Sequence, residues 1–154
     1  MKLLLDTHTF IWLNIAPEKL TPTALAACED PDNELYFSVV SAWEIEIKAQ
    51  LGRLTLHVPL KDMVEVQQTD NGLQILPVEL RHVYALDTLP QVHNDPFDRL
   101  LIAQARAEQA HLVTADSQLK RYPVDIFMVV VEVGLSLCEA SVGCVPRPAE
   151  GYGP

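Results

Sequence analysis

The chain has 154 residues, of which 49% are hydrophobic, and its formal net charge at pH 7 is −10. This length and composition suit one compact domain with a single core. The acidic charge disfavours loose, charge-driven binding to nucleic acid, because such binding needs a cationic surface. A role on nucleic acid would therefore require a local basic rim or a bound metal.

The sequence carries no signal for export or for membrane insertion. The N-terminal stretch MKLLLDTHTFIWL contains Asp6 and lacks a small-residue cleavage site after a long apolar run. The longest apolar stretch, IFMVVVEVGLSLC, is interrupted by Glu132 and is too short to span a bilayer. An odd set of cysteines (Cys28, Cys138 and Cys144) then indicates free thiols rather than a disulfide framework. We expect a cytoplasmic protein that does not bind membranes.

Strand-like and helical segments alternate from the N-terminus. Residues 2–6 (KLLLD) form a short apolar run ending in an acid, which is typical of a strand buried on both faces of a parallel sheet. A helical stretch containing FIWL follows. Thr21 and Pro22 have the pattern of an N-cap and a first helical position. Residues 34–40 (ELYFSVV) predict the second strand.

The same alternation continues along the chain. Ser41 is predicted to cap a helix through AWEIEIKAQL that ends at Gly52, and Pro59 opens another helix that closes at Asn71-Gly72. The third strand LQILPV, the helix ELRHVYAL and the loop DTLPQVH precede a helix from 96 to about 109. HLVT is then the fourth strand, DSQLKRY a short helix and VDIFMVV the fifth strand.

This order of elements predicts an α/β fold with a parallel sheet and helices on both faces. The character of the chain changes from about Glu132, where Gly, Pro and small residues replace any periodicity. We therefore expect a single domain over residues 1–131 and an irregular or disordered tail over residues 132–154.

Acidic residues lie where the predicted strands end. In an open parallel sheet, ligands bind outside the carboxyl ends of the strands. The acids near that edge are Asp6 at the end of the first strand, Glu44 in the first turn of the helix after the second strand, Asp95 and Asp98 at the start of the helix before the fourth strand, and Asp116 after that strand, with Thr114 two residues earlier.

Taken singly, each acid has a structural explanation. Three of them can cap the helices that follow, and Asp98 can be the acid of a first turn. Glu44 can complete a capping box SAWE or pair with Lys48. If the acids lay close together, capping alone would not explain them, because two carboxylates about 4 Å apart near a surface repel by roughly 4 kcal/mol. A cluster would need protons or cations, and oxygen ligands select Mg²⁺ or Mn²⁺, which can activate water for phosphodiester hydrolysis.

Four segments, LLLDTHTFIW, SVVSAWEIEIK, HNDPFDRLLIAQA and LVTADSQLKRYPV, resemble in order and spacing the PIN domains of VapC-type toxins of type II toxin–antitoxin systems. The resemblance runs from residue 2 to about residue 130. It implies a three-layer α/β/α fold with a sheet in the order 3-2-1-4-5 and a Mg²⁺- or Mn²⁺-dependent endoribonuclease activity. By motif, it gives catalytic and metal-binding roles to Asp6, Glu44, Asp98 and Asp116, and supporting roles to Asp95 and Thr114.

The resemblance also implies partners. The substrate would be RNA, hydrolysed in line to leave 5′-phosphate and 3′-hydroxyl ends. A small antitoxin would wrap the toxin and place a basic side chain in the acidic pocket. The apolar segments FIWL and MVEV would offer grooves either to that antitoxin or to a second copy in a homodimer. The tail after about residue 132 departs from the family, whose chains typically end soon after the last strand.

The remaining polar and aromatic residues point less clearly to chemistry. His8 and His93 are beside acids and are at most adjacent to the site, because no histidine pair has zinc-type spacing. Trp12 and Trp43 are predicted to pack in the core rather than to stack on bases. An RNA substrate would need some basic contacts against the charge of −10; the candidates are Arg99, Arg106, Lys48, Arg53, Lys120 and Arg121.

Two enzymatic alternatives are weaker, and one non-enzymatic alternative stays open. Phosphatases with an aspartyl nucleophile after the first strand carry a D-x-D motif there. Here Asp6 is followed two residues later by His8 instead of a second Asp. A phosphate-accepting receiver domain would require a Lys after the last strand, and none lies there. A non-catalytic acidic α/β module would bind only a partner. Measuring divalent-ion binding with and without Asp6 separates this module from an enzyme.

Overall fold

The computed structural model describes residues 1–92 and 94–128. Five strands form one sheet in the order β3-β2-β1-β4-β5, and all neighbouring strands pair in parallel. The predicted α/β class and the strand order 3-2-1-4-5 are confirmed. The strands are β1 (Lys2–Leu5), β2 (Glu34–Ser38), β3 (Gln74–Leu76), β4 (His111–Thr114) and β5 (Ile126–Met128).

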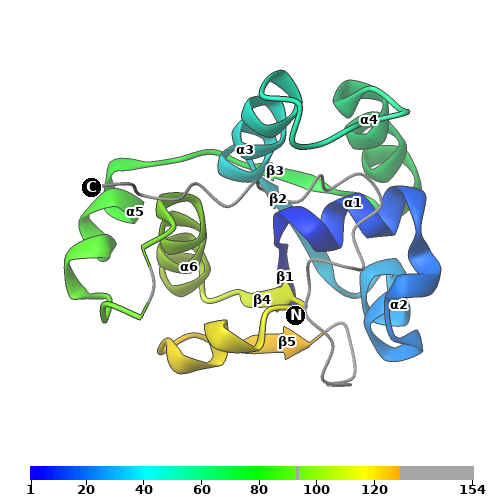
Figure 1. The fold of residues 1–154 in the computed structure, drawn as a ribbon. Coiled ribbons are helices and arrows are strands. Elements are labelled where there is room, and N and C mark those ends of the chain that lie inside the picture. Colours follow the sequence, from blue (N-terminus) through cyan, green and yellow to red (C-terminus); the bar gives the residue numbers. More distant parts are fainter. Residues whose placement is uncertain (93, 129–154) are drawn as a thin grey trace.

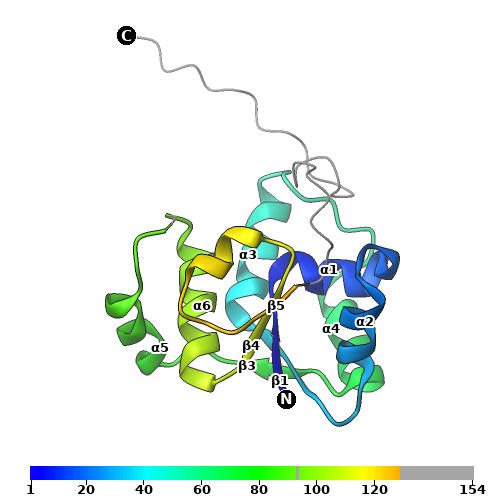
Figure 2. The ribbon, with the colours of Figure 1, turned by 90° about the horizontal axis from the view of Figure 1, so that it is seen from below.

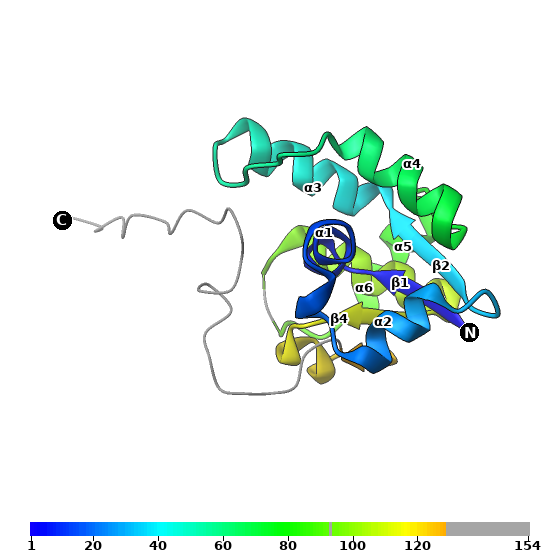
Figure 3. The ribbon, with the colours of Figure 1, turned by 90° about the vertical axis from the view of Figure 1, so that its right-hand side faces the viewer.

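Helices cover both faces of the sheet (Figure 1, Figure 2). One side carries α1 (Thr7–Ile15), α2 (Pro22–Glu29) and α4 (Leu60–Asn71), and the other carries α5 (Leu80–Ala85) and α6 (Pro96–Glu108). The remaining helix, α3 (Val39–Gln50), contacts both α1 and α6 and stands beside α1 in Figure 3. Short 3-10 helices are η1 (Pro17–Lys19), η2 (Leu86–Thr88) and η3 (Ser117–Arg121). Within the described part of the chain, no helix is long and apolar enough to cross a membrane.

The residues of β1 explain the two layers of the core. Leu3, Leu4 and Leu5 are all 0% exposed. Because side chains alternate along a strand, Leu3 and Leu5 join the apolar cluster that contains Phe10 of α1. Leu4 joins the opposite cluster, which contains Ile102 of α6. The run KLLLD is therefore a strand buried on both faces, as predicted.

The start of α3 differs from the prediction. Ser38, not Ser41, is the N-cap, because its hydroxyl oxygen accepts a hydrogen bond of 3.0 Å from the backbone N–H of Val40. Val39 and Val40, which were predicted to end the second strand, are therefore helical. Glu44 lies in the second turn instead of the first, and the predicted SAWE capping box does not form.

Other local signals were correct. The hydroxyl of Thr21 caps α2 by accepting from the N–H of Ala24 at 3.2 Å. Gly72 ends α4 with a φ of +65°, a left-handed conformation that glycine adopts without steric cost. The segment DSQLKRY forms η3, a 3-10 helix rather than an α-helix.

The prediction that FIWL offers a surface groove is wrong. These four residues are between 0% and 7% exposed and belong to the core cluster on the α1 side. In the second segment, MVEV, the side chain of Met63 is buried at 2% exposure, whereas Val66 is 49% exposed. The FIWL side chains of α1 pack in the core, so they offer no exposed surface to a partner.

Candidate active site

Asp6 stands at the junction of β1 and α1. Its Oδ1 accepts a hydrogen bond of 2.7 Å from the N–H of Thr9, so Asp6 is the N-cap of α1. Its Oδ2 accepts a hydrogen bond from the hydroxyl of Thr114, the last residue of β4. The Thr114 oxygen in turn accepts from the N–H of Asp116 at 3.0 Å. These bonds join the residues that follow β1 and β4, two neighbouring strands of the sheet.

Glu44 reaches the same edge of the sheet from α3. Its side chain is buried, with 6% of the residue exposed. Oε2 accepts a hydrogen bond of 2.6 Å from the hydroxyl of Thr7, and Oε1 lies 2.6 Å from Nζ of Lys48. The spacing in the sequence predicts the ion pair with Lys48, whereas no local pattern predicts the contact with Thr7.

The other three acids lie at helix starts. Asp95 is the N-cap of α6, where its Oδ1 accepts from the N–H groups of Phe97 at 2.9 Å and Asp98 at 3.3 Å. Asp116 caps η3 by accepting from the N–H of Gln118 at 2.9 Å. The capping roles predicted for Asp95 and Asp116 are therefore confirmed. A capping role does not prevent either acid from also lying near Asp98.

Asp98 lies among the other acids. Burial of its carboxyl, followed by the negative charges around it, raises the pKa of Asp98 from 3.8 to about 8. These charges belong, largest effect first, to Asp95, Glu44, Asp6 and Asp116. The other four predicted acids therefore all lie within electrostatic range of Asp98. At neutral pH the Asp98 carboxyl holds a proton unless a cation takes its place.

The acids offer carboxylate oxygens that could hold a metal ion. Among residues 1–92 and 94–128, no three His, Cys, Asp or Glu side chains lie close enough together to hold an ion as they stand. The donors are nevertheless carboxylate oxygens, which suit a hard divalent cation. Each oxygen that accepts one hydrogen bond keeps a second lone pair. The chemistry of these donors therefore fits a hydrated divalent cation.

A buried hydroxyl lies one helical turn before Glu44 on α3. The Oγ atom of Ser41 is buried and has no hydrogen-bond partner in the described part of the chain. Ser41 precedes Glu44 by one helical turn on the buried side of α3. An unsatisfied buried hydroxyl costs about 1–3 kcal/mol, so this oxygen offers one further polar group on the buried side of the helix that carries Glu44.

The histidines and tryptophans take three different positions. His8 is exposed on α1, with its ring centroid 6.1 Å from that of Trp12, and His93 lies outside the described residues. Trp12 is 5% exposed, which confirms the core prediction. The same prediction is wrong for Trp43, which is 62% exposed and contacts the ring of Phe97. The face of α3 that carries Trp43 is only partly covered by α6.

Several of the basic side chains proposed as phosphate contacts have protein partners. Lys48 pairs with an acid of the site. Arg99 donates a hydrogen bond of 2.9 Å to the carbonyl oxygen of Pro90. Arg106 donates one of 3.4 Å to the hydroxyl of Thr88. The other three, all exposed, remain predictions: Arg53, Lys120 and Arg121.

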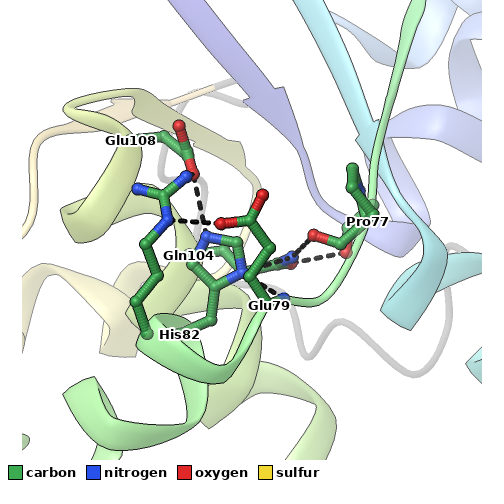
Figure 4. Close-up of polar contacts among 7 residues, drawn as sticks. Pro77, Glu79, His82, Gln104 and Glu108 are labelled. Carbon is green, nitrogen blue, oxygen red and sulfur yellow. Dashed lines mark hydrogen bonds and ion pairs between the residues drawn. The ribbon is translucent and has the colours of Figure 1, made fainter.

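A second polar cluster, which was not predicted, joins α5 to the C-terminal part of α6 (Figure 4). His82 is 0% exposed, and its Nδ1 accepts a hydrogen bond of 3.0 Å from the N–H of Glu79. The ring proton therefore lies on Nε2, which faces Oε1 of Glu108 at 2.8 Å. Gln104 is also buried and donates to the carbonyl oxygen of Pro77 at 3.1 Å. Asp95 and Asp98 lie at the other end of α6, so this cluster is separate from the acids.

Comparisons with known proteins agree with this architecture. The model of the PIN domain family matches residues 3–125. Over 120 residues the chain is 30% identical to Ribonuclease VapC22 of Mycobacterium tuberculosis, which covers 77% of this chain and 90% of that protein. The chain belongs to the PIN domain family, and this curated relative is a VapC ribonuclease.

Solved structures share the fold at low sequence identity. VapBC2 of Rickettsia felis, bound to a DNA fragment from its promoter, has a TM-score of 0.63 and 16% identity over 84% of this chain and 99% of that chain. DNA-bound VapBC of Salmonella typhimurium has a TM-score of 0.59 and 17% identity over 83% and 98%. A toxin–antitoxin complex from Klebsiella pneumoniae has a TM-score of 0.55 and 17% identity over 81% and 96%.

Proposed function

We propose that this PIN domain protein is a metal-dependent endoribonuclease and the toxin of a VapC-type toxin–antitoxin pair. The observation that carries the proposal is the gathering of four acids around Asp98, whose pKa is raised to about 8. Crowded carboxylates are stabilised by protons or by cations. The kinship with a VapC ribonuclease supports RNA as the substrate.

Four carboxylates would hold the ion: Asp6, Glu44, Asp98 and Asp116. Bound there, Mg²⁺ or Mn²⁺ supplies a Lewis acid for the scissile phosphate and lowers the pKa of water. Asp95 has a supporting role, because its carboxylate holds the first turn of α6 and the backbone of Asp98 in place.

The hydroxyl groups of the chain orient these acids. Thr114 donates to Oδ2 of Asp6, and Thr7 donates to Oε2 of Glu44. Each bond restricts the rotation of a carboxylate without using all of its lone pairs. Lys48 neutralises part of the charge of Glu44, which lowers the repulsion within the cluster.

We also propose an antitoxin as a partner. VapBC assemblies and a toxin–antitoxin complex among the structural neighbours support this proposal. A basic side chain of the antitoxin, placed among the acids, would neutralise the charge that raises the pKa of Asp98. It would thereby compete with the metal ion for the same carboxylates.

The second copy in a homodimer would pack against α5. This six-residue helix exposes Leu80 (63%), Val83 (44%) and Tyr84 (67%) and lies on the outer side of α6 (Figure 1). Large exposed apolar patches mark interaction sites on soluble proteins. Leu80→Glu should convert a dimer to a monomer in analytical ultracentrifugation, and a dimer that persists would exclude α5 as the interface.

Replacing Asp98 by Asn tests the proposed activity. Asp98→Asn is expected to abolish metal-dependent cleavage of RNA while the circular dichroism spectrum stays unchanged. Asp125→Asn, which alters an exposed acid outside the cluster, is the matched control and should cleave normally. Full cleavage by Asp98→Asn would remove this residue from the active site. If the wild-type chain binds no Mn²⁺ by calorimetry, and Asp6→Asn changes nothing, the chain is a partner-binding module instead.

A further inference from the structure

Trp43 is an exposed aromatic residue directly beside the acid cluster. It immediately precedes Glu44 on α3, yet it is 62% exposed whereas Glu44 is 6% exposed. Consecutive residues of an α-helix project about 100° apart. Glu44 therefore points inward to Thr7, while Trp43 lies at the border of the buried face, on the side of α3 that meets α6.

A second aromatic ring holds the indole of Trp43 in place. The ring centroids of Trp43 and Phe97 are 5.3 Å apart with an interplanar angle of 73°, a favourable edge-to-face arrangement. Phe97 immediately precedes Asp98 at the start of α6. Each aromatic residue thus precedes one of the acids in sequence. Together, Trp43 and Phe97 form an aromatic platform at the rim of the acid cluster.

The charge of the protein makes an uncharged contact with RNA valuable. The net charge is −10, and the acids around Asp98 add local repulsion for phosphate groups. Lys48, the basic residue nearest to the acids along α3, is already paired with Glu44. Stacking of a nucleobase on an aromatic ring needs no positive charge and tolerates any base, because every base has a π-face.

We propose that Trp43, supported by Phe97, stacks against an unpaired nucleobase next to the scissile phosphate. The proposal rests on the ribonuclease function proposed above and extends it to the form of the substrate. A base in an intact duplex is stacked on its neighbours and cannot lie against the indole ring. The substrate is therefore a single-stranded segment or a loop, and Trp43 sets the position of the strand relative to the acids.

Tryptophan fluorescence tests the contact directly, because the chain has only two tryptophans. Trp12 is 5% exposed, so Trp43 is the ring that RNA can reach. In the inactive Asp98→Asn background, titration with a single-stranded ten-nucleotide RNA should quench the emission. The same titration of Asp98→Asn/Trp43→Phe, which keeps only Trp12, should show no quenching. Quenching of equal size in both proteins, or in neither, would overturn the proposal.

Binding and cleavage provide a second measurement. In the same background, Trp43→Ala should weaken binding of the single strand by about 5- to 150-fold, a range that follows from the usual contribution of one stacked base. Trp43→Phe should retain most of the affinity. The matched control is Leu51→Ala, which removes a side chain of similar exposure (60%) from the C-terminal end of the same helix and should bind normally. The fold-loss caused by Trp43→Ala should be the same at 50 and 200 mM KCl, because stacking is not electrostatic.

The outcome is distinguishable from failure of the proposed function. If the wild-type chain does not cleave RNA, the ribonuclease proposal fails and takes this inference with it. If the wild type cleaves and Asp98→Asn does not, but Trp43→Ala binds and cleaves single-stranded RNA like the wild type, only the present inference is overturned. If Trp43→Ala leaves RNA binding intact and weakens a dimer or an antitoxin complex, the aromatic platform belongs to a protein interface and the inference is again wrong.

Discussion

The hydroxyl of Thr7 donates a hydrogen bond of 2.6 Å to Oε2 of Glu44, across 37 positions of the sequence. Because Nζ of Lys48 lies 2.6 Å from the other oxygen, both oxygens of this buried carboxylate have partners. The contact ties the first turn of α1 to α3 at the edge of the sheet where the acids gather. The orientation of Glu44 therefore depends on a residue outside the acidic motif.

Thr7→Val should reduce activity without unfolding the protein. Valine has nearly the shape of threonine but cannot donate a hydrogen bond, so Glu44 loses the contact that fixes its rotation. Removal of a residue that orients a metal ligand typically costs about 10- to 100-fold in metal affinity or activity. Mn²⁺ calorimetry and a cleavage assay measure the two effects. Thr7→Ser should retain most of the activity.

The same substitution at a remote threonine provides the control. Thr23 is exposed on α2, and Thr23→Val should leave metal affinity and cleavage unchanged. If Thr7→Val also cleaves RNA at the wild-type rate, the hydrogen bond to Glu44 has no part in positioning this acid.

Most of the fold could be predicted because the decisive signals are local. KLLLD is apolar at consecutive positions, which suits only an element buried on both sides, and all of Leu3, Leu4 and Leu5 are buried. The cap at Thr21 and the turn at Gly72 depend on backbone chemistry within a few residues. The start of α3 was missed because β-branched residues favour strands. The hydroxyl of Ser38 nevertheless binds the N–H of Val40 and ends the strand two residues earlier.

The candidate site was only partly predictable. The positions of the acids follow from their places at strand and helix ends, and the structure gathers them around Asp98. Thr7 was missed because its partner is distant in sequence, and nothing near it in the chain identifies a donor to Glu44. Trp43 was predicted to lie in the core because it was assigned to an apolar face of its helix. Its exposure depends on how far α6 extends over α3, which is a tertiary property.

Asp98 should make the metal-free protein less stable as the pH rises. Its pKa is about 8 in the folded protein and 3.8 ordinarily, so between these values the folded state binds a proton that the unfolded state has lost. The free energy of unfolding therefore falls as the pH rises from about 4 to about 8. Asp98→Asn cannot ionise, and at pH 8 in EDTA we expect it to exceed the wild type by about 1 kcal/mol or more, roughly 2–4 °C in Tm.

The pH and metal dependence of that difference provide the controls. The gain should vanish below about pH 4, where the wild-type carboxyl is protonated in both the folded and the unfolded state, and Asp125→Asn should show no gain at any pH. Added Mn²⁺ should raise the Tm of the wild type, because an ion that binds only the folded state stabilises it, and should raise that of Asp98→Asn less. Equal Tm values for wild type and Asp98→Asn at pH 8 would contradict the raised pKa.

Cys28 should react slowly with thiol reagents in the folded protein. Burial, together with the charge of Glu29, raises the pKa of Cys28 from 9.0 to about 11. At pH 8 its reactive thiolate is therefore about 100-fold scarcer than in an unfolded chain, in addition to the shielding of a side chain that is 2% exposed. The measurement uses Cys138→Ser/Cys144→Ser, in which Cys28 is the only cysteine, and compares the rate with that in urea. Similar rates in both conditions would show that α2 opens readily.

The two nitrogens of the His82 ring make different hydrogen bonds, so substitutions of His82 should affect stability to different degrees. Nδ1 accepts a hydrogen bond from the N–H of Glu79, whereas Nε2 faces the carboxylate of Glu108. His82→Ala removes both contacts and leaves a cavity, so it should lower the free energy of unfolding by about 2–4 kcal/mol. His82→Asn keeps an acceptor near the place of Nδ1 and should lose clearly less. Urea unfolding measures both. Equal losses for Ala and Asn would mean that the bond to the N–H of Glu79 adds nothing, and that filling the space between α5 and α6 is the whole contribution of His82.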